Sequence, residues 1–191
     1  MEKINLDKKS INTKKLVYIS LLVSISIVLH TLEAMLPLPS PWIKLGITNI
    51  GTLLAIVLLG FQEALVVAFL RALIGSILFG TFLSPTFMLS LAGGMSSAIV
   101  MGLFYKFSFG YFSLVSVSFL GAYTHTTVVM ALVYFFIIHH NELLYLFPIF
   151  LLFSAVTGIM NGLLANVFLR KLTEEKSLDI KIKQNEIAKT I

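Results

Sequence analysis

Long apolar runs, separated by short clusters of charged, polar, Gly and Pro residues, dominate the pattern of this chain. Several runs reach the roughly 20 residues that a helix needs to cross a hydrocarbon core about 30 Å thick. The runs lack the alternation of polar and apolar positions that a membrane β-barrel would show. The pattern therefore predicts an all-α membrane protein, a bundle of six transmembrane helices: Leu16 to Leu36, Ile47 to Leu59, Glu63 to Phe79, Pro85 to Tyr105, Phe112 to Ile138 and Leu144 to Leu169.

The second and third runs are short, and only Gly60, Phe61 and Gln62 lie between them. One long buried element is the alternative to two helices. The combined length is nearly twice that of a single span, which favours a tight hairpin of two short helices.

The composition agrees with a membrane protein, because 58% of the residues are hydrophobic and only 12% are charged. A soluble domain of this size could not bury that much apolar surface. We expect one membrane domain over residues 16–172, between a basic tail over residues 1–15 and a charged tail over residues 173–191. The chain has no cysteine, which excludes disulfides, thiolate nucleophiles and cysteine metal sites.

The basic residues gather on one side of the six predicted spans. Five lysines precede the first span, Lys106 follows the fourth, and six basic residues follow the sixth, while Lys44 is the lone basic loop residue on the other side. By the positive-inside rule, both termini should face the cytoplasm, in a multi-pass protein of the cell membrane. The formal net charge of +5 is mostly tail charge, which favours anionic lipid over nucleic acid as a partner.

Arg71 lies near the middle of the third apolar run. An arginine at membrane depth costs roughly 2.5–3.5 kcal/mol on insertion scales, so such residues usually face a bundle interior or a polar cavity. Glu63, eight residues earlier, would be about 12 Å away along the helix and cannot pair with it. A structural brace to another helix, with Glu33 as a candidate, and a site for an anion remain equal alternatives.

Other polar residues at depth fall in the outer half of the predicted spans, with His125 midway along the fifth. His125 shares a helical face with Ser118 and Ala122, so it would point inward if that face is packed. A hydrogen-bonded core histidine is an equally good interpretation. The remaining polar positions at this depth are His30, Glu33, Asn49, Thr124, Thr126 and Thr127.

Small residues at intervals of four mark faces where helices can approach closely. Ser154, Gly158 and Gly162 form such a face on the sixth span. Ser20 and Ser24 form another near the start of the first span, and spacing alone leaves open whether it packs internally or against another membrane protein.

The chain carries no pattern typical of an enzyme. It has no Walker phosphate loop, no HExxH zinc motif and no paired carboxylates at helical spacing within the spans. Its two aspartates, Asp7 and Asp179, lie in the tails, so the chain cannot by itself build an aspartate-rich magnesium site. We expect neither catalysis nor a resident cofactor or metal.

Four segments in order, residues 43–50, 70–80, 84–94 and 118–125, resemble the Gx transporter family, also catalogued as heptaprenyl diphosphate synthase component I. The resemblance extends over about residues 16–172. That family is similar in turn to the substrate-binding S components of energy-coupling factor (ECF) transporters. The resemblance implies six helices and an outward-facing pocket that is closed by the loop after the first helix.

Carried over by position, the resemblance implies that Lys44 and Asn49 lie at the pocket lip, the stretch from Ser90 to Gly94 and Arg71 along its wall, and His125 at its floor. Trp42 could cap the pocket, and Glu33 or Asn49 could orient the cationic groups. The family usually has Asn directly after the histidine and Gln three positions later, where this chain has Thr126 and Val129. The resemblance therefore implies no ligand contact from amides at these two positions, which leaves room for a different substrate preference.

The sequence hypothesis is a non-enzymatic substrate-binding subunit for a small anionic or polar-aromatic metabolite, of the vitamin or flavin and quinone-precursor type. Uptake would require a separate membrane coupling protein and ATPases, with Ser20 and Ser24 as the candidate docking face. One alternative is a non-catalytic membrane subunit of a heptaprenyl diphosphate synthase, and another is an assembly factor of a membrane redox complex.

Overall fold

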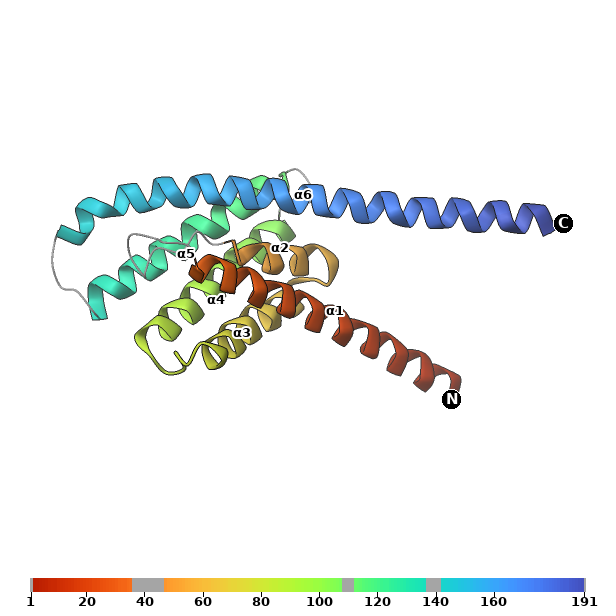
Figure 1. The fold of residues 1–191 in the computed structure, drawn as a ribbon, viewed down its shortest axis with the longest axis horizontal. Helices are drawn as coiled ribbons and strands as arrows, with labels where there is room; N and C mark the ends of the chain where they lie inside the picture. Colours follow the sequence, from red (N-terminus) through yellow and green to blue (C-terminus); the bar gives the residue numbers. More distant parts are fainter. Residues whose placement is uncertain (1, 36–46, 108–111, 137–141, 191) are drawn as a thin grey trace.

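The computed structural model describes residues 2–35, 47–107, 112–136 and 142–190, and the side chains of residues 13–32, 47–107, 112–136 and 145–175. These ranges form six α-helices and no strands (Figure 1). The predicted all-α architecture with six helices is confirmed. The helices are α1 (Glu2–Met35), α2 (Asn49–Leu58), α3 (Phe61–Leu78), α4 (Pro85–Phe107), α5 (Leu114–Phe136) and α6 (Glu142–Thr190).

Five of the helices contain stretches that are long and apolar enough to cross a membrane: Thr13–Leu32, Phe61–Leu78, Pro85–Phe107, Leu114–Phe136 and Tyr145–Glu175. The second predicted span is correctly placed, but its helix is shorter than the apolar run. With 10 residues, α2 is about 15 Å long at ~1.5 Å per residue. It therefore crosses only about half of a 30 Å core.

The connection between α2 and α3 is a tight hairpin, as predicted. The backbone N–H groups of Leu59 and Gly60 both donate to the carbonyl of Ala55, at 2.9 and 3.0 Å. Gly60 has φ of +113°, a backbone conformation that residues with a Cβ rarely adopt. The glycine thus ends α2 and lets α3 begin at Phe61.

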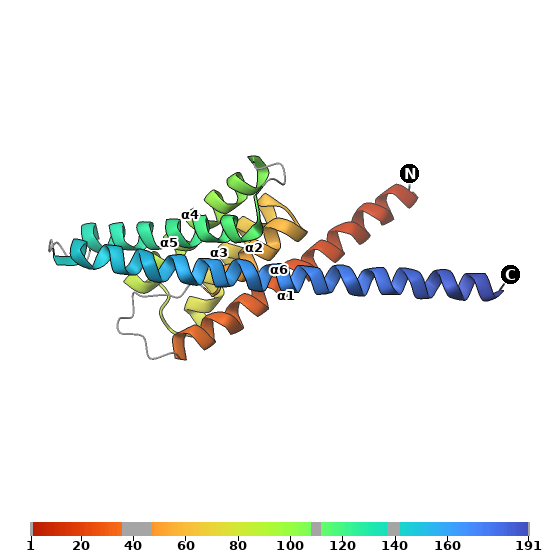
Figure 2. The ribbon, with the colours of Figure 1, turned by 90° about the horizontal axis from the view of Figure 1, so that it is seen from above.

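The terminal helices continue beyond the apolar spans into both charged tails. In Figures 1 and 2, the N-terminal end of α1 and the C-terminal end of α6 extend from the same end of the bundle. This arrangement agrees with both termini on one side of a membrane, as the six spans predicted from the sequence imply.

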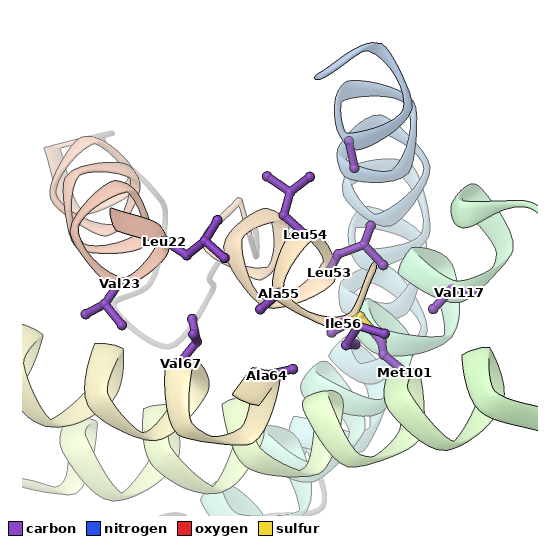
Figure 3. Packing of buried hydrophobic residues seen from close by; sticks show 11 residues of the cluster. Leu22, Val23, Leu53, Leu54, Ala55, Ile56, Ala64, Val67, Met101 and Val117 are labelled. Carbon is purple, nitrogen blue, oxygen red and sulfur yellow. The ribbon is translucent and has the colours of Figure 1, made fainter. Parts of the chain in front are cut away.

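The main apolar cluster lies in the half of the bundle near the Gly60 hairpin, and every helix contributes to it. Figure 3 shows its members closing around α2. The buried members of this main cluster are Leu22, Val23, Leu53, Leu54, Ala55, Ile56, Ala64, Val67, Met101, Val117 and Ala165. A second, smaller apolar cluster consists of Leu89, Val129 and Val133 of α4 and α5.

The predicted small-residue face of α6 packs against α5. A methyl group added at Gly162 would lie 2.5 Å from the Cα of Val115, and one at Gly158 would lie 3.0 Å from the Cα of Phe119. Such distances leave no room for a Cβ. In a bilayer, this close backbone approach takes the place of the hydrophobic effect in holding helices together.

Candidate functional site

Arg71 is buried midway along α3, with 6% of its surface exposed. Its Nη1 and Nη2 both donate to Oδ1 of Asn49, each at 3.5 Å, which is at the long end of the hydrogen-bond range. Two nitrogens of the guanidinium therefore share one amide oxygen through two long hydrogen bonds. The structure joins α3 to the first residue of α2 through this contact.

The other end of the Asn49 side chain is a donor with no partner among the described residues. A guanidinium can only donate, so Oδ1 must face Arg71 and Nδ2 must face away. Asn49 is 3% exposed, and its Nδ2 has no hydrogen-bond partner among the described residues. A buried polar group without a partner costs about 1–3 kcal/mol, so this amide favours the arrival of an acceptor.

The start of α2 adds to the positive character of this region. Asn49 is the first residue of the helix, and within the described residues the preceding Thr48 makes no side-chain capping hydrogen bond. The N-terminus of a helix carries partial positive charge on its unsatisfied N–H groups. The guanidinium of Arg71 lies beside that terminus, so both features favour a negative charge at the same place.

Two consecutive glycines of α4 bring Arg71 and His125 to one level. A methyl group added at Gly94 would lie 2.9 Å from Nη2 of Arg71. A methyl group at Gly93 would lie 2.9 Å from Nε2 of His125 and 2.8 Å from Cγ2 of Val129. The guanidinium and the imidazole therefore occupy the space of two absent side chains, on two sides of α4.

His30 of α1 lies one turn of α3 beyond Arg71. A methyl group at Gly75 would be 3.6 Å from Cδ2 of His30, and the imidazole meets the ring of Phe79 edge-on, with ring centres 5.5 Å apart. The sequence pattern predicts His30 in the outer half without assigning it to the site. The structure brings it to the same region as Arg71.

The remaining predicted site residues are less central or fall outside the described residues. Ser90 is half-buried on α4, and its hydroxyl donates to the carbonyl of Thr86 at 2.7 Å. Thr126 is half-buried beside His125. Trp42 and Lys44 lie outside the described residues, as does the side chain of Glu33 and with it the predicted brace to Arg71.

Ser20 and Ser24 lie on an exposed face of α1, and their hydroxyls donate to the carbonyls of Leu16 and Ser20, at 2.9 and 2.8 Å. Their polarity is thus satisfied within the helix. This exposed face of α1 is available for contact with lipid or another membrane protein.

Three buried hydroxyl groups that the sequence pattern does not single out for the site have no hydrogen-bond partner among the described residues. They belong to Thr52, Ser97 and Ser154. Their unpaired state depends on contacts between helices, which no sequence pattern reveals. A hint exists for Thr52, which shares a helical face with Asn49 three residues before it.

The donors of this region are chemically suited to binding a negatively charged or hydrogen-bond-accepting group. A guanidinium, an amide and an imidazole can hold an anion or a hydrogen-bond acceptor. The described side chains include no group of three or more histidine or acidic residues placed to share a metal ion.

The family model described as heptaprenyl diphosphate synthase component I matches residues 22–168, well over half of the chain. The chain belongs to this family. The matched range contains α2 to α5 entirely and also His30 of α1, so it includes Arg71 and the residues described around it. Comparison with curated protein sequences gives no significant match.

The fold of this family member is also similar to a solved structure, that of the S component of a bacterial ECF transporter. The TM-score is 0.68 at 21% sequence identity, and the match covers 85% of this chain and 97% of that one. At this identity the similarity establishes the fold, and the S-component-like architecture expected from the sequence is confirmed.

Proposed function

We propose that the protein is the substrate-binding subunit of a transporter in the cell membrane, and that it captures a small anionic or polar-aromatic metabolite of the vitamin or flavin and quinone-precursor type. Arg71 carries the proposal. Its guanidinium is buried at mid-depth beside the α2 N-terminus and beside an amide whose donor has no partner among the described residues. An ionisable residue at membrane depth is by default a functional-site hypothesis.

The other donors have defined roles in this proposal. Asn49 orients the guanidinium through Oδ1 and offers Nδ2 to the same acceptor, while His125 lies across α4 at the same level. Lys44 would act at the pocket lip, as the family resemblance implies. Trp42 would cap the pocket, and Glu33 would act as an orienting group. The binding step itself requires no chemistry from this chain.

Transport requires partners in this scheme. The chain carries no nucleotide-binding motif, so the energy for uptake comes from separate ATPases through a membrane coupling protein. The exposed face of α1 at Ser20 and Ser24 is the proposed contact for that coupling protein. The S-component fold supports this assignment.

The first test is native mass spectrometry of the gently purified protein, which should reveal a co-purifying small anion. Calorimetry with that molecule then shows whether Arg71 recognises the ligand or only holds two helices together. Arg71→Gln should weaken binding by roughly 2–5 kcal/mol, the range for breaking a buried charge pair, and leave the apo protein about as stable. Arg71→Lys should recover only part of the affinity, because an ammonium cannot engage an acid bidentately.

A purely structural brace gives a different result. If Arg71 serves only to pair with Glu33, Arg71→Gln should lower thermal stability, and adding Glu33→Gln should largely restore it. Unchanged ligand affinity in Arg71→Gln would reject the anion site.

The family description favours one second candidate, a non-catalytic membrane subunit of a heptaprenyl diphosphate synthase. A cluster of cationic donors would also fit a diphosphate. Under either candidate, the purified protein alone should make no prenyl diphosphate from short precursors with magnesium present. Genes for ATPases and a coupling protein beside its own would favour the transporter, and a gene for a soluble aspartate-rich synthase would favour the second candidate.

A further inference from the structure

We propose that the ligand site continues one helical turn deeper than Arg71, to the hydroxyl groups of Thr52 and Ser97. The ligand then carries a neutral hydrogen-bonding group about one helical turn from its anionic group. This inference rests on the proposed function, and it adds the second half of the ligand's chemistry.

The hydroxyls of Thr52 and Ser97, like that of Ser154, differ from most helical hydroxyls among the described residues. Helical hydroxyls in this protein commonly donate to a backbone carbonyl of the preceding turn, as Ser26 does to Leu22 at 2.7 Å and Thr31 does to Ile27 at 3.0 Å. Thr52 and Ser97 are both fully buried, at 0% exposure, and within the described residues neither hydroxyl has a hydrogen-bond partner. They are therefore available to a group that comes from elsewhere.

Contacts at two levels place Thr52 and Ser97 opposite each other. At the upper level, Arg71 bonds Asn49 of α2 and fills the space beside Gly94 of α4. At the lower level, Ile56 of α2 and Met101 of α4 belong to one packed cluster and lie beside each other in Figure 3.

On α2, Thr52 follows Asn49 by three residues and precedes Ile56 by four. On α4, Ser97 follows Gly94 by three residues and precedes Met101 by four. Since α2 and α4 are in register at both levels, Thr52 and Ser97 share the level between them.

A third helix packs closely at this middle level, where the side chains of Ser97 and Met101 fill the space beside a glycine of α5. A methyl group added at Gly121 of α5 would lie 3.1 Å from Oγ of Ser97 and 2.4 Å from Sδ of Met101. Below it, Ile56, Met101 and Val117 form apolar packing, which closes the site. The polar part therefore has two layers, one cationic and one of neutral hydroxyls.

The chemistry of each layer specifies one part of the ligand. Arg71 and Nδ2 of Asn49 offer donors to a carboxylate or phosphate. A hydroxyl can donate or accept, so the lower layer suits a neutral hydroxyl, carbonyl or amide group. One helical turn, ~5.4 Å, separates the two groups.

The first measurement concerns the apo protein. Thr52→Val keeps the shape and removes the hydroxyl, so it should raise the melting temperature, by about 2–4 °C for a chain of this size, because a buried unpaired group is lost. Thr157→Val is the matched control, since that hydroxyl donates to the carbonyl of Ser154 at 3.1 Å, and it should not raise the melting temperature. A lower melting temperature in Thr52→Val means that a trapped water or backbone group already satisfies the hydroxyl, and it overturns the proposal.

The second measurement uses two rigid probes, benzoate and 4-hydroxybenzoate, whose hydroxyl lies across the ring from the carboxylate. Calorimetry on detergent-solubilised protein should show that the wild type prefers the hydroxylated probe about tenfold, the equivalent of one hydrogen bond. Thr52→Val, and Ser97→Ala as a second variant, should each abolish this preference.

Equal affinity for the two probes, or a preference that survives both variants, overturns the second layer. Benzoate binding that is lost in Arg71→Gln would still support the proposed function in that case. Binding of neither probe to the wild type overturns the two-layer ligand chemistry, while the co-purified molecule remains the separate test of the proposed function.

Discussion

At the scale of single residues, two glycines without side chains shape the site as much as the polar side chains do. Gly93 and Gly94 leave the space that the imidazole of His125 and the guanidinium of Arg71 occupy. Any Cβ at these positions would push a polar group away from α4. The glycines thus determine where the positive charge lies.

Gly94→Ala should displace Arg71, because the new methyl group would lie 2.9 Å from Nη2. We expect ligand affinity to fall by about tenfold or more, since the guanidinium loses its geometry with Asn49. Gly75→Ala is the matched control, because its methyl group would meet His30 at an ordinary 3.6 Å. That variant should bind normally and gain up to about 1 kcal/mol from helix propensity.

Calorimetry with the co-purified ligand and thermal unfolding of both variants would check this contrast. Equal losses of affinity in the two variants would show that Gly94 does not control the position of Arg71.

The sequence could single out Arg71, Asn49 and His125, because polar groups in apolar runs stand out against their neighbours. It could not show that Gly93 faces His125, or that Thr52 and Ser97 share a level. Those relations depend on the register of one helix against another. Register follows from packing across the bundle, which a one-dimensional pattern does not contain.

At the scale of helices, an ion pair joins α1 to α3 at the end far from Arg71. Lys15 of α1 pairs with Glu63 of α3, and their side chains are 42% and 15% exposed. Water screens the lysine in part, so the pair stabilises the contact only modestly. It nevertheless fixes α1 against the start of α3, next to the Gly60 hairpin.

A double-mutant cycle with Lys15→Ala and Glu63→Ala should give a coupling free energy of about 0.2–1 kcal/mol. Unfolding in detergent measures it, and raised salt should reduce it. The pair of Arg170 and Glu174, at 3.1 Å on the surface of α6, serves as a comparison, because both residues belong to one helix. A coupling of zero between Lys15 and Glu63 would mean that apolar packing alone holds α1.

Apolar runs predicted most of the helix positions. Pro85 begins α4 as expected, because the first helical position tolerates proline. The runs predicted the end of α2 to within one residue, at Leu59 against Leu58, but they did not predict where α1 begins or where α6 ends. Both helices continue into the charged segments, and at α6 Arg170 and Glu174 pair one turn apart.

At the scale of the whole molecule, the termini extend from one end of the bundle, and the basic residues predict that this end is cytoplasmic. The absence of native cysteine makes labelling straightforward. Cysteines introduced at Ser40 and Asn141 should react with an impermeant reagent on intact cells, and those at Asn12 and Ser177 should not. Labelling of all four, or the opposite pattern, would reject this orientation.

The short α2 and its tight turn into α3 bear on how the nascent chain enters the bilayer. Alone, α3 would present Arg71 to lipid, at a cost of roughly 2.5–3.5 kcal/mol, and α2 is too short to remain inserted by itself. The two segments should therefore leave the translocon together, with Asn49 already shielding the guanidinium. Gly94 of α4, which also lies against the guanidinium, is synthesised only later. Arg71 therefore determines both the binding region and the order in which the helices insert.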